Sequence, residues 1–315
     1  MPVYHRIEEV QFHGAHLAVG SFDGVHRGHQ RLVEAMVHQA HANREPAVVL
    51  TFHPHPSVVL GRRSKPSYLS APEERAQWLG ALGVDSVILQ PFTLELSRVR
   101  AAEFLDRLVR HLGLRSLWAG PDFALGHNRE GNLQFLKEYG VQAGFQVHTV
   151  APLEYGAEVI SSTRIRRYLS QGDVISAAAC LGRPYRLTGQ VTEGAHRGVG
   201  LGIPTANLDA PEERAIPARG VYATWVWVQG QRHPGVTNIG IRPTFEENAN
   251  LTIEAHLLDF QSDLYGKELR LDFMARIRDE QKFSGPKELL GQIQRDVATA
   301  RARLRESSSA SPQPD

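Results

Sequence analysis

The sequence predicts two domains: an α/β domain built on a parallel sheet, followed by a small antiparallel β-barrel that carries a long C-terminal helix. The first reason is length, because 315 residues is about twice the usual size of a single domain. The second is that the first half alternates short apolar runs with helix-like stretches, which is typical of a parallel sheet. The third is that the second half is rich in Val, Thr, Tyr and Trp, with Gly or Pro between the runs.

In the first half, five short apolar runs are expected to form the parallel sheet; they span residues 17–20, 47–52, 86–89, 116–119 and 146–150. Helices are expected between them, because apolar residues recur at helical spacing in segments 32–40 and 102–112. Two further helices, at 163–169 and 173–181, are expected to close this domain. The Gly-Arg-Pro sequence at 182–184 breaks the pattern and places the predicted boundary after residue 183.

In the second half, four runs are expected to form antiparallel strands; they span residues 185–191, 220–228, 252–258 and 269–275. A helix is predicted over 286–305, because Leu289 and Val297 lie on one apolar face that can cover the sheet. This domain is expected to occupy residues 184–306. The last residues, 307–315, hold four Ser and two Pro and no large apolar side chain, which predicts a disordered tail.

Composition excludes several classes of protein. Apolar residues make up 42% of the chain and charged residues 22%, as in folded globular proteins. Lys and Arg number 35 against 34 Asp and Glu, so the chain lacks the positive field that nonspecific nucleic-acid binding requires. Cys180 is alone, which excludes an internal disulfide and a zinc site built from several thiolates. No long apolar run or basic leader is present, so we expect a cytoplasmic protein with no membrane partner.

The most informative segment is GSFDGVHRGH, residues 20–29, which leaves the first predicted strand and enters the first predicted helix. Its glycines let a ligand approach the backbone closely, and the N-terminus of a helix offers free N–H donors to a phosphate. His26 and His29 are three positions apart, so both side chains can reach one phosphate and stabilise charge in a transition state. The alternative is that both histidines are ordinary polar residues of an exposed helical turn.

This segment resembles the signature of the nucleotidyltransferase superfamily, and its longer form, GxFDGVHxGHQ, is similar to the FAD synthetase family. Three more segments match that family in order: TFHPHP at 51–56, GPDFALG at 120–126 and ISSTRIR at 160–166. The resemblance implies a Rossmann-like first domain that transfers an adenylyl group from ATP to FMN, giving FAD and pyrophosphate. The family usually has Asp-Phe-x-Phe-Gly where this chain has Leu125 in place of the second Phe.

The resemblance also assigns residues to this site. It implies that the nucleotide is bound by Gly20, Phe22, Asp23, Gly24, Asp122, Ser162, Thr163 and Arg166, and that the flavin lies near His53, His55 and Pro56. Ser162 and Thr163 can also cap the following helix, and Arg166 can neutralise phosphate charge. Asp23 has a second interpretation as a turn or cap residue. His53 and His55 could instead form a metal pair, although no third ligand stands near them in the sequence.

The second half contains four more motifs: GVGLGIPTAN at 198–207, GVY at 220–222, NIGIRPTF at 238–245 and EAHLLDF at 254–260. Together they resemble the riboflavin kinase module. The resemblance implies a β-barrel domain that phosphorylates riboflavin to FMN with ATP, and the turn between Gly198 and Gly202 could hold the nucleotide phosphates. This half has no P-loop, and the spacing of its glycines does not match a dinucleotide fingerprint.

Oxygen ligands in this half indicate a magnesium site. Thr205 and Asn207 are two positions apart, so on an extended segment both side chains face the same way, and Mg²⁺ takes few protein ligands, all of them oxygens. The family assigns Mg²⁺ to this pair. Without the resemblance, Thr205 and Asn207 are simply turn formers.

The family gives Glu254 the role of general base, because a carboxylate at the open end of a barrel can accept the proton of the riboflavin 5′-hydroxyl. The alternative for Glu254 is a solvated side chain on the outward face of a strand. The resemblance also places Arg278, Glu280 and Phe283 beside the flavin. A cation and an aromatic side chain can hold the flavin ring system there.

Two residues depart from the family pattern. Val199 stands where relatives usually carry a basic residue, and Ile203 stands where they usually carry an aromatic one. We therefore expect the kinase site to bind ATP more weakly than in relatives with the basic residue. Two other hypotheses stay open: the first site acts on a different small-molecule phosphate with a regulatory flavin-binding domain behind it, or the chain is a flavin carrier without enzymatic activity. Oligomeric state is not predicted.

Overall fold

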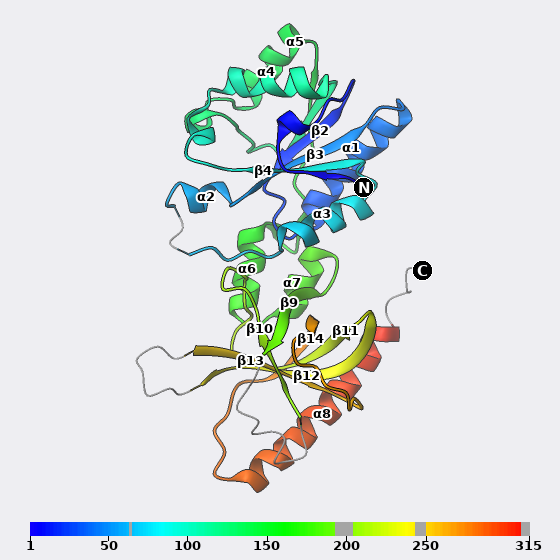
Figure 1. The fold of residues 1–315 in the computed structure, drawn as a ribbon, viewed down its shortest axis with the longest axis vertical. Coiled ribbons are helices and arrows are strands. Elements are labelled where there is room, and N and C mark those ends of the chain that lie inside the picture. The colour runs from blue at the N-terminus through cyan, green and yellow to red at the C-terminus, as the bar shows by residue number, and fades with distance from the viewer. Residues whose placement is uncertain (63–64, 193–203, 243–249, 310–315) are drawn as a thin grey trace. The chain divides into compact units, whose positions relative to one another are not determined.

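The computed structural model describes residues 1–62, 65–192, 204–242 and 250–309. The chain divides into two compact units, Met1–Ser162 and Thr163–Asp315, and each has its own sheet (Figure 1). The division comes earlier than the boundary predicted after residue 183, because helix α7 (Val174–Leu181) packs on strands of the second unit.

The first unit contains a six-stranded sheet with the strand order β1-β4-β3-β2-β5-β6, and all neighbouring strands run parallel. The strands are β1 (Val3–Tyr4), β2 (His16–Gly20), β3 (Ala47–His53), β4 (Ser86–Pro91), β5 (Ser116–Ala119) and β6 (Gln146–Thr149). From β2 the chain adds β3 and β4 on one side and later returns to add β5 and β6 on the other. The loop after β2 therefore lies where the strand order reverses, which is the usual ligand site of an open α/β sheet.

Helices cover both faces of this sheet. They are α1 (Arg27–Ala42), α3 (Pro72–Ala81), α4 (Ala101–Leu112) and α5 (Leu133–Ala143). The short helix α2 (Pro56–Val59), which has no buried residue, follows β3. Met36 of α1 and Leu79 of α3 belong to the core on one face, and Leu105 of α4 belongs to the core on the other. Because successive strand residues point to opposite faces, Leu17 belongs to the α4 core and Ala18 to the α1 core.

The five strands predicted for this half are confirmed as β2 to β6. The sequence missed β1 and the hairpin of β7 (Glu154–Tyr155) and β8 (Glu158–Val159), because two residues are too few to show an alternating pattern. It assigned no residues to α3 or α5. The apolar pattern of α3 is weak because its inner face buries a charged side chain, Arg75.

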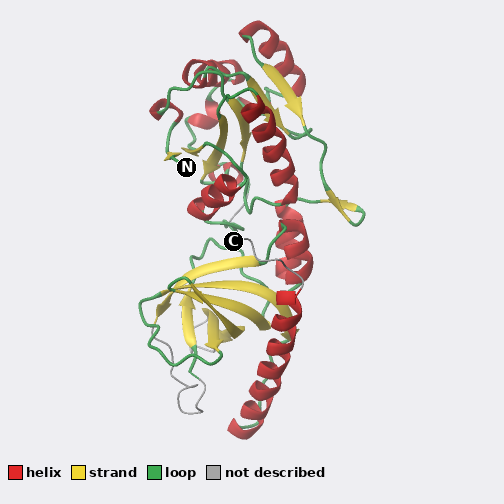
Figure 2. Ribbon diagram, turned by 90° about the vertical axis from the view of Figure 1, so that its right-hand side faces the viewer, coloured by secondary structure: helices red, strands yellow, loops and turns green. Residues whose placement is uncertain are grey.

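In the second unit, α6 (Ser162–Ser170) and α7 precede a closed antiparallel barrel of six strands. The strands are β9 (Tyr185–Thr192), β10 (Ala206–Asp209), β11 (Gly220–Val228), β12 (Gln231–Arg242), β13 (Asn250–Leu257) and β14 (Glu268–Arg278). Tyr185, Tyr222 and Phe273 are fully buried. The long helix α8 (Pro286–Ser309) packs on β11, β12 and β14, and Figure 2 shows the strands curving into the barrel.

The predicted fold class, a parallel α/β domain followed by a β-barrel and a long helix, is confirmed. The sequence missed β10, which has four residues, and β12, whose first half contains Gln, Arg, His, Pro and Gly. Helix α8 continues to Ser309, so residues 307–309 of the predicted tail are helical, and residues 310–315 lie outside the described part of the chain. Among the described residues, no helix combines the length and apolar character that crossing a membrane requires.

Candidate functional site

The turn between β2 and α1 has an unusual backbone. Phe22 has φ 45°, Gly24 has φ 78° and Val25 has φ 38°, so two residues with side chains adopt a left-handed conformation that favours glycine. Each such residue costs about 1–3 kcal/mol and persists only where the surrounding structure fixes it. Here both side chains are buried, and the amide of Val25 donates to the carbonyl of Phe22 at 2.9 Å. The turn is held in one strained shape.

His26 and His29 come together as the sequence predicts for a single site. Their rings stack with centroids 3.6 Å apart, and the edge of Phe22 contacts His29 at 5.1 Å between centroids. His26 is the N-cap of α1, because its Nδ1 accepts a hydrogen bond from the amide of His29 at 3.3 Å. This bond requires an unprotonated Nδ1 and fixes the direction of the His26 ring.

The environment of His29 keeps its imidazole neutral. Burial lowers the pKa of His29 well below its ordinary value, and the nearby His26 and Arg75 lower it further. Its Nδ1 is buried and has no hydrogen-bond partner among the described residues. A neutral imidazole can donate one hydrogen bond to a phosphate oxygen without carrying a charge of its own.

Asp23 lies inside the turn and is completely buried. Its carboxylate accepts hydrogen bonds from the amides of Leu69 and Ser70, at 3.0 and 3.2 Å. Arg75 of α3 stands 3.9 Å away. Of the two interpretations of Asp23, these contacts support the one in which it is a turn residue, since its carboxylate ties the turn to the loop before α3.

Ser162 also fixes this turn, because its hydroxyl donates to the carbonyl of Asp23 at 2.9 Å. Gly20 has little room for a side chain, since a Cβ there would lie 3.1 Å from the Phe22 ring. Thr163 and Arg166 belong to the second unit, so their predicted role at the triphosphate stays a prediction.

A cavity of about 400 Å³ opens beside the turn. Four phenylalanines line it, Phe52, Phe92, Phe104 and Phe123, together with Gly20, His55, Pro56, Arg62 and Asn128. The size and the aromatic walls suit a planar ring system. Two of the predicted flavin residues, His55 and Pro56, are in this wall, whereas His53 packs against Tyr68 with ring centroids 5.4 Å apart. Phe52 and Phe123 stand in two of the matching motifs, whereas Phe92 and Phe104 lie outside every motif and the sequence did not indicate them.

His55 is held by its own helix. Its Nδ1 lies 2.7 Å from the hydroxyl of Ser57 and accepts the amide of Ser57 at 3.1 Å, so His55 caps α2. The backbone amide of His55 donates to the hydroxyl of Tyr68 at 2.9 Å. Because its Nδ1 is already used in these bonds, His55 fits the wall of a cavity better than the metal pair considered from the sequence.

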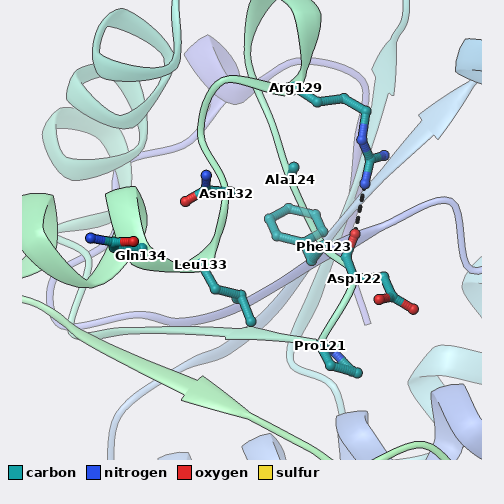
Figure 3. Close-up of a pocket in the computed structure, with 8 residues that line it drawn as sticks. All are labelled: Pro121, Asp122, Phe123, Ala124, Arg129, Asn132, Leu133 and Gln134. Carbon is teal, nitrogen blue, oxygen red and sulfur yellow. Dashed lines mark hydrogen bonds between the residues drawn. The ribbon is translucent and has the colours of Figure 1, made fainter.

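Phe123 lines this cavity and also an open hollow of about 410 Å³, which Figure 3 shows. Figure 3 shows the Phe123 ring pointing toward the side where Asn132 and Leu133 lie, while the Asp122 carboxylate points away from them. Arg129 donates to the carbonyl of Asp122 at 2.7 Å. The predicted nucleotide residue Asp122 therefore lies on the rim of this hollow with its backbone fixed by Arg129.

In the second unit, strand register brings predicted residues together. Asn207 of β10 pairs with Glu254 of β13, and Glu254 pairs on its other side with Asn238 of β12. Directly paired residues point to the same face of a sheet, so the carboxylate stands between two amides. The next residue in this row, Val221, packs under α8. Glu254 therefore lies on the outer face of the barrel, in the same row as Val221. This row includes the last residue of β9, Thr192, and the last residue of β14, Arg278.

Glu280 joins this row. A Cβ at Gly240 would collide with the Glu280 carboxylate and would lie 3.2 Å from Nδ2 of Asn238. The absence of a side chain at Gly240 therefore lets Glu280 lie over β12, next to Asn238. The sequence did not single out Asn238 or Gly240, although both stand in a motif that matched the kinase module.

Arg278 is fixed by α8. Its Nε and Nη2 donate to the carboxylate of Asp296 at 3.0 and 2.7 Å, and Asp296 is 3% exposed. The guanidinium lies 5.7 Å from the centroid of the Phe283 ring. Two of the predicted flavin residues, Arg278 and Phe283, are thus adjacent, and the sequence missed Asp296, which orients Arg278.

Thr205 lines a hollow of about 490 Å³ with Val191, Ala206, Leu257 and residues of the loop after β13. The Nδ1 of His256 donates to the carbonyl of Pro204 at 2.8 Å, which fastens this segment to β13. The predicted residues Gly198, Gly202, Val199 and Ile203 lie outside the described part of the chain. Within the described residues, no group of three or more His, Cys, Asp or Glu side chains could hold a metal ion.

Two family models match the chain: FAD synthetase over residues 8–164 and riboflavin kinase over residues 181–304. The bifunctional riboflavin kinase/FMN adenylyltransferase of Pseudomonas fluorescens is 39% identical over 290 residues, which covers 92% of this chain and 93% of that protein. The protein of the same name from Escherichia coli (strain K12) is 36% identical over 300 residues, with 94% and 95% covered.

A crystal structure titled macrolide-efflux protein from Streptococcus pneumoniae matches 96% of this chain and 98% of its own, with a TM-score of 0.87 and 30% identity. The matches in sequence and in structure extend through both units. The chain therefore belongs to the family of bifunctional riboflavin kinases/FMN adenylyltransferases.

Proposed function

We propose that this chain makes FAD from riboflavin in two ATP-dependent steps. The second unit phosphorylates riboflavin to FMN, and the first unit joins FMN to the adenylyl group of a second ATP. The observation that carries the proposal is that each unit has its own site of a different kind: a strained turn with stacked histidines beside an aromatic cavity in the first, and a carboxylate between two asparagines in the second.

In the adenylyl transfer, a phosphate oxygen of FMN attacks the α-phosphorus of ATP, and the bond from that phosphorus to the pyrophosphate oxygen breaks. His26 and His29 hydrogen-bond the α-phosphate oxygens, on which negative charge grows in the transition state. The FMN ring system occupies the cavity lined by Phe52, Phe92 and Phe123. No protein nucleophile is required, and catalysis consists of alignment and charge stabilisation.

In the phosphorylation, the riboflavin 5′-hydroxyl attacks the γ-phosphorus of ATP and ADP leaves. Glu254 takes the hydroxyl proton as general base. Its neighbours Asn207 and Asn238 cannot serve as the base, because an amide cannot take up a proton at neutral pH. Glu280, Arg278 and Phe283 hold the flavin, with Arg278 fixed by Asp296.

The donors present suit magnesium, since Thr205 and Asn207 both offer oxygen atoms, and Asn207 pairs directly with Glu254. Mg²⁺ bound there with the ATP phosphates would neutralise charge on the transferred phosphoryl group. We assign the remaining nucleotide contacts to Asp122, Thr163 and Arg166 in the adenylyl-transfer site and to Gly198 and Gly202 in the kinase site, as the family resemblance implies. ATP, riboflavin, FMN and FAD are the small-molecule partners.

The test is an incubation of the purified chain with riboflavin, ATP and MgCl₂, followed by chromatographic separation of the flavins. FMN is expected first and FAD after it. Formation of FAD only from added FMN would instead support an adenylyltransferase with a regulatory second unit, and the absence of any turnover would support a flavin carrier. A reaction with EDTA in place of MgCl₂ serves as the control and is expected to yield neither product.

A further inference from the structure

Arg75 on α3 is a buried cation to which neither the motifs nor the proposed reactions give a role. Its side chain is 1% exposed. Nη1 donates to the hydroxyl of Thr51 at 3.0 Å and to the carbonyl of Phe52 at 3.2 Å, at the end of β3. Nη2 lies 3.9 Å from the carboxylate of Asp23. Because burying a charge is costly unless it is paired and hydrogen-bonded, a guanidinium at this place requires an explanation.

The contacts of Arg75 lead to the strained turn by two routes. In the first, the Thr51 hydroxyl that accepts from Arg75 donates to the carbonyl of Ser21 at 2.9 Å. In the second, Arg75 faces Asp23, whose carboxylate binds the amide and hydroxyl of Ser70, and the Ser70 hydroxyl accepts the amide of Gly24 at 3.0 Å. Both routes end on backbone atoms of the turn that carries the histidines.

We propose that Arg75 is a positioning residue of the adenylyl-transfer site, which holds the phosphate-binding turn in its strained shape through Thr51 and Asp23. The proposal rests on the proposed function of the first unit. The left-handed backbone at Phe22 and Val25 explains why such support is needed, since those conformations persist only where their surroundings fix them. Arg75 itself need not touch the substrate.

Arg75 also has an electrostatic effect on the site. After burial and His26, its charge is the third cause that lowers the pKa of His29. Asp23, Tyr68 and Glu73 act on Arg75 in turn and raise its pKa against the larger effect of burial. The pKa of His29 is therefore expected to change when the Arg75 charge is removed.

The first experiment compares Arg75→Met with wild type. A misplacement of about 1 Å costs on the order of 100-fold in rate, so kcat for FAD formation from FMN and ATP is expected to fall about 100-fold. The kinase rate of the same molecules is expected to be unchanged, which shows that the second unit is intact. Arg110→Met is the matched control, because it removes an exposed arginine of the same unit.

NMR titration of the His29 ring supplies a readout that general loss of stability would not move. The pKa of His29 should rise in Arg75→Met, where the charge is gone, and stay low in Arg75→Lys, where it is kept. Arg75→Lys should still lose about 10-fold in kcat, because one ammonium group cannot bridge Thr51, Phe52 and Asp23 as the guanidinium does.

If Arg75→Met does not fold, a second pair of variants decides the question. Thr51→Val removes the hydroxyl that links Arg75 to Ser21, and Thr51→Ser keeps it, so the serine variant should transfer the adenylyl group about 10-fold faster. Equal rates for these two would overturn the proposal, as would an Arg75→Met enzyme with kcat within threefold of wild type and an unchanged His29 titration. Wild-type enzyme without FAD formation would refute the proposed function instead.

Discussion

The two candidate sites of this chain are built in opposite ways. In the first unit, the site is a turn of consecutive residues between β2 and α1, strained and fixed by buried contacts from α3 and from the loop before it. In the second, it is a row of residues from three strands, placed side by side by the register of the barrel. The first therefore depends on the support of its backbone, and the second depends on strand pairing.

The histidine and carboxylate chemistry differs accordingly. His29 is neutral because burial and two neighbours lower its pKa, which suits a hydrogen-bond donor to a phosphate. Glu254 lies on the outer wall of the barrel between two amides, which suits a group that must accept a proton from a bound hydroxyl. Changes at the two sites should separate the two activities, and the following predictions test that separation.

The largest effect is expected for Glu254→Ala. Loss of a general base costs about 10²–10⁴-fold in rate, so FMN formation from riboflavin should disappear at ordinary enzyme concentrations. FAD formation from supplied FMN should stay at the wild-type rate. Single-turnover assays of both reactions check this, and a parallel loss of FAD formation would contradict the two-site arrangement. Glu268→Ala, which removes an exposed carboxylate from β14, is the control.

The converse effect is expected for His29→Ala. One hydrogen-bond donor to a developing charge contributes about 10²–10³-fold, so FAD formation from FMN and ATP should fall by that factor. Riboflavin phosphorylation should continue, and FMN should accumulate when riboflavin is supplied. The accumulated flavin is measured by chromatography. A histidine outside the site, His38, is exposed on the same helix and serves as a matched His→Ala control.

A smaller effect is expected at Gly240. In Gly240→Ala the new methyl group would collide with Glu280 and crowd Asn238, so Glu280 must leave its place over β12. We expect the KM for riboflavin to rise about 10-fold, the equivalent of about 1.4 kcal/mol, with little change in kcat and none in adenylyl transfer. Gly291→Ala on α8 is the control, since its nearest neighbour would be an ordinary contact at 3.8 Å. An unchanged KM would remove Glu280 from the flavin site.

The smallest effect is on stability and follows from the lowered pKa of His29. As pH falls below about 6.5, the unfolded chain binds a proton at this histidine, whereas the folded first unit does not until its lower pKa is reached. The unfolded state then binds more protons, so the free energy of unfolding decreases with falling pH across that window, by up to about 1.4 kcal/mol per pH unit.

Denaturant unfolding of wild type and His29→Gln between pH 7 and pH 5 checks this prediction. The variant lacks the titrating group, so its loss of stability over this range should be smaller than that of the wild type. Curves that run parallel would mean that His29 ionises in the folded protein as it does in the unfolded chain.

Much of the fold was predictable, because hydrophobic periodicity is a local property. The parallel strands β2 to β6 are continuous apolar runs, and α8 repeats its apolar residues at helical spacing. Elements that depend on pairing or packing with distant segments showed no hydrophobic periodicity. β12 begins with Gln, Arg, His and Pro, yet it pairs along its length with β11 and β13. α3 buries an arginine where the pattern expects an apolar residue.

The candidate site residues also fall into two groups, those in consecutive motifs and those brought together by packing. Residues in consecutive motifs, such as His26 with His29 and Thr205 with Asn207, could be named from sequence because their spacing and their resemblance to a family are both visible there. Phe92, Asn238 and Asp296 could not, since each becomes part of a site only through the packing of distant segments.

The sequence by itself thus determined the two-domain organisation, the strand and helix types of the long elements, and the chemical groups available for phosphate transfer. These depend on local pattern and composition. Only the tertiary structure decided that Asp23 is buried as a turn support, that Arg75 lies behind the turn, and that Glu254 stands between Asn207 and Asn238 on the outer wall of the barrel. Burial and strand register join residues far apart in the chain, so no local pattern specifies them.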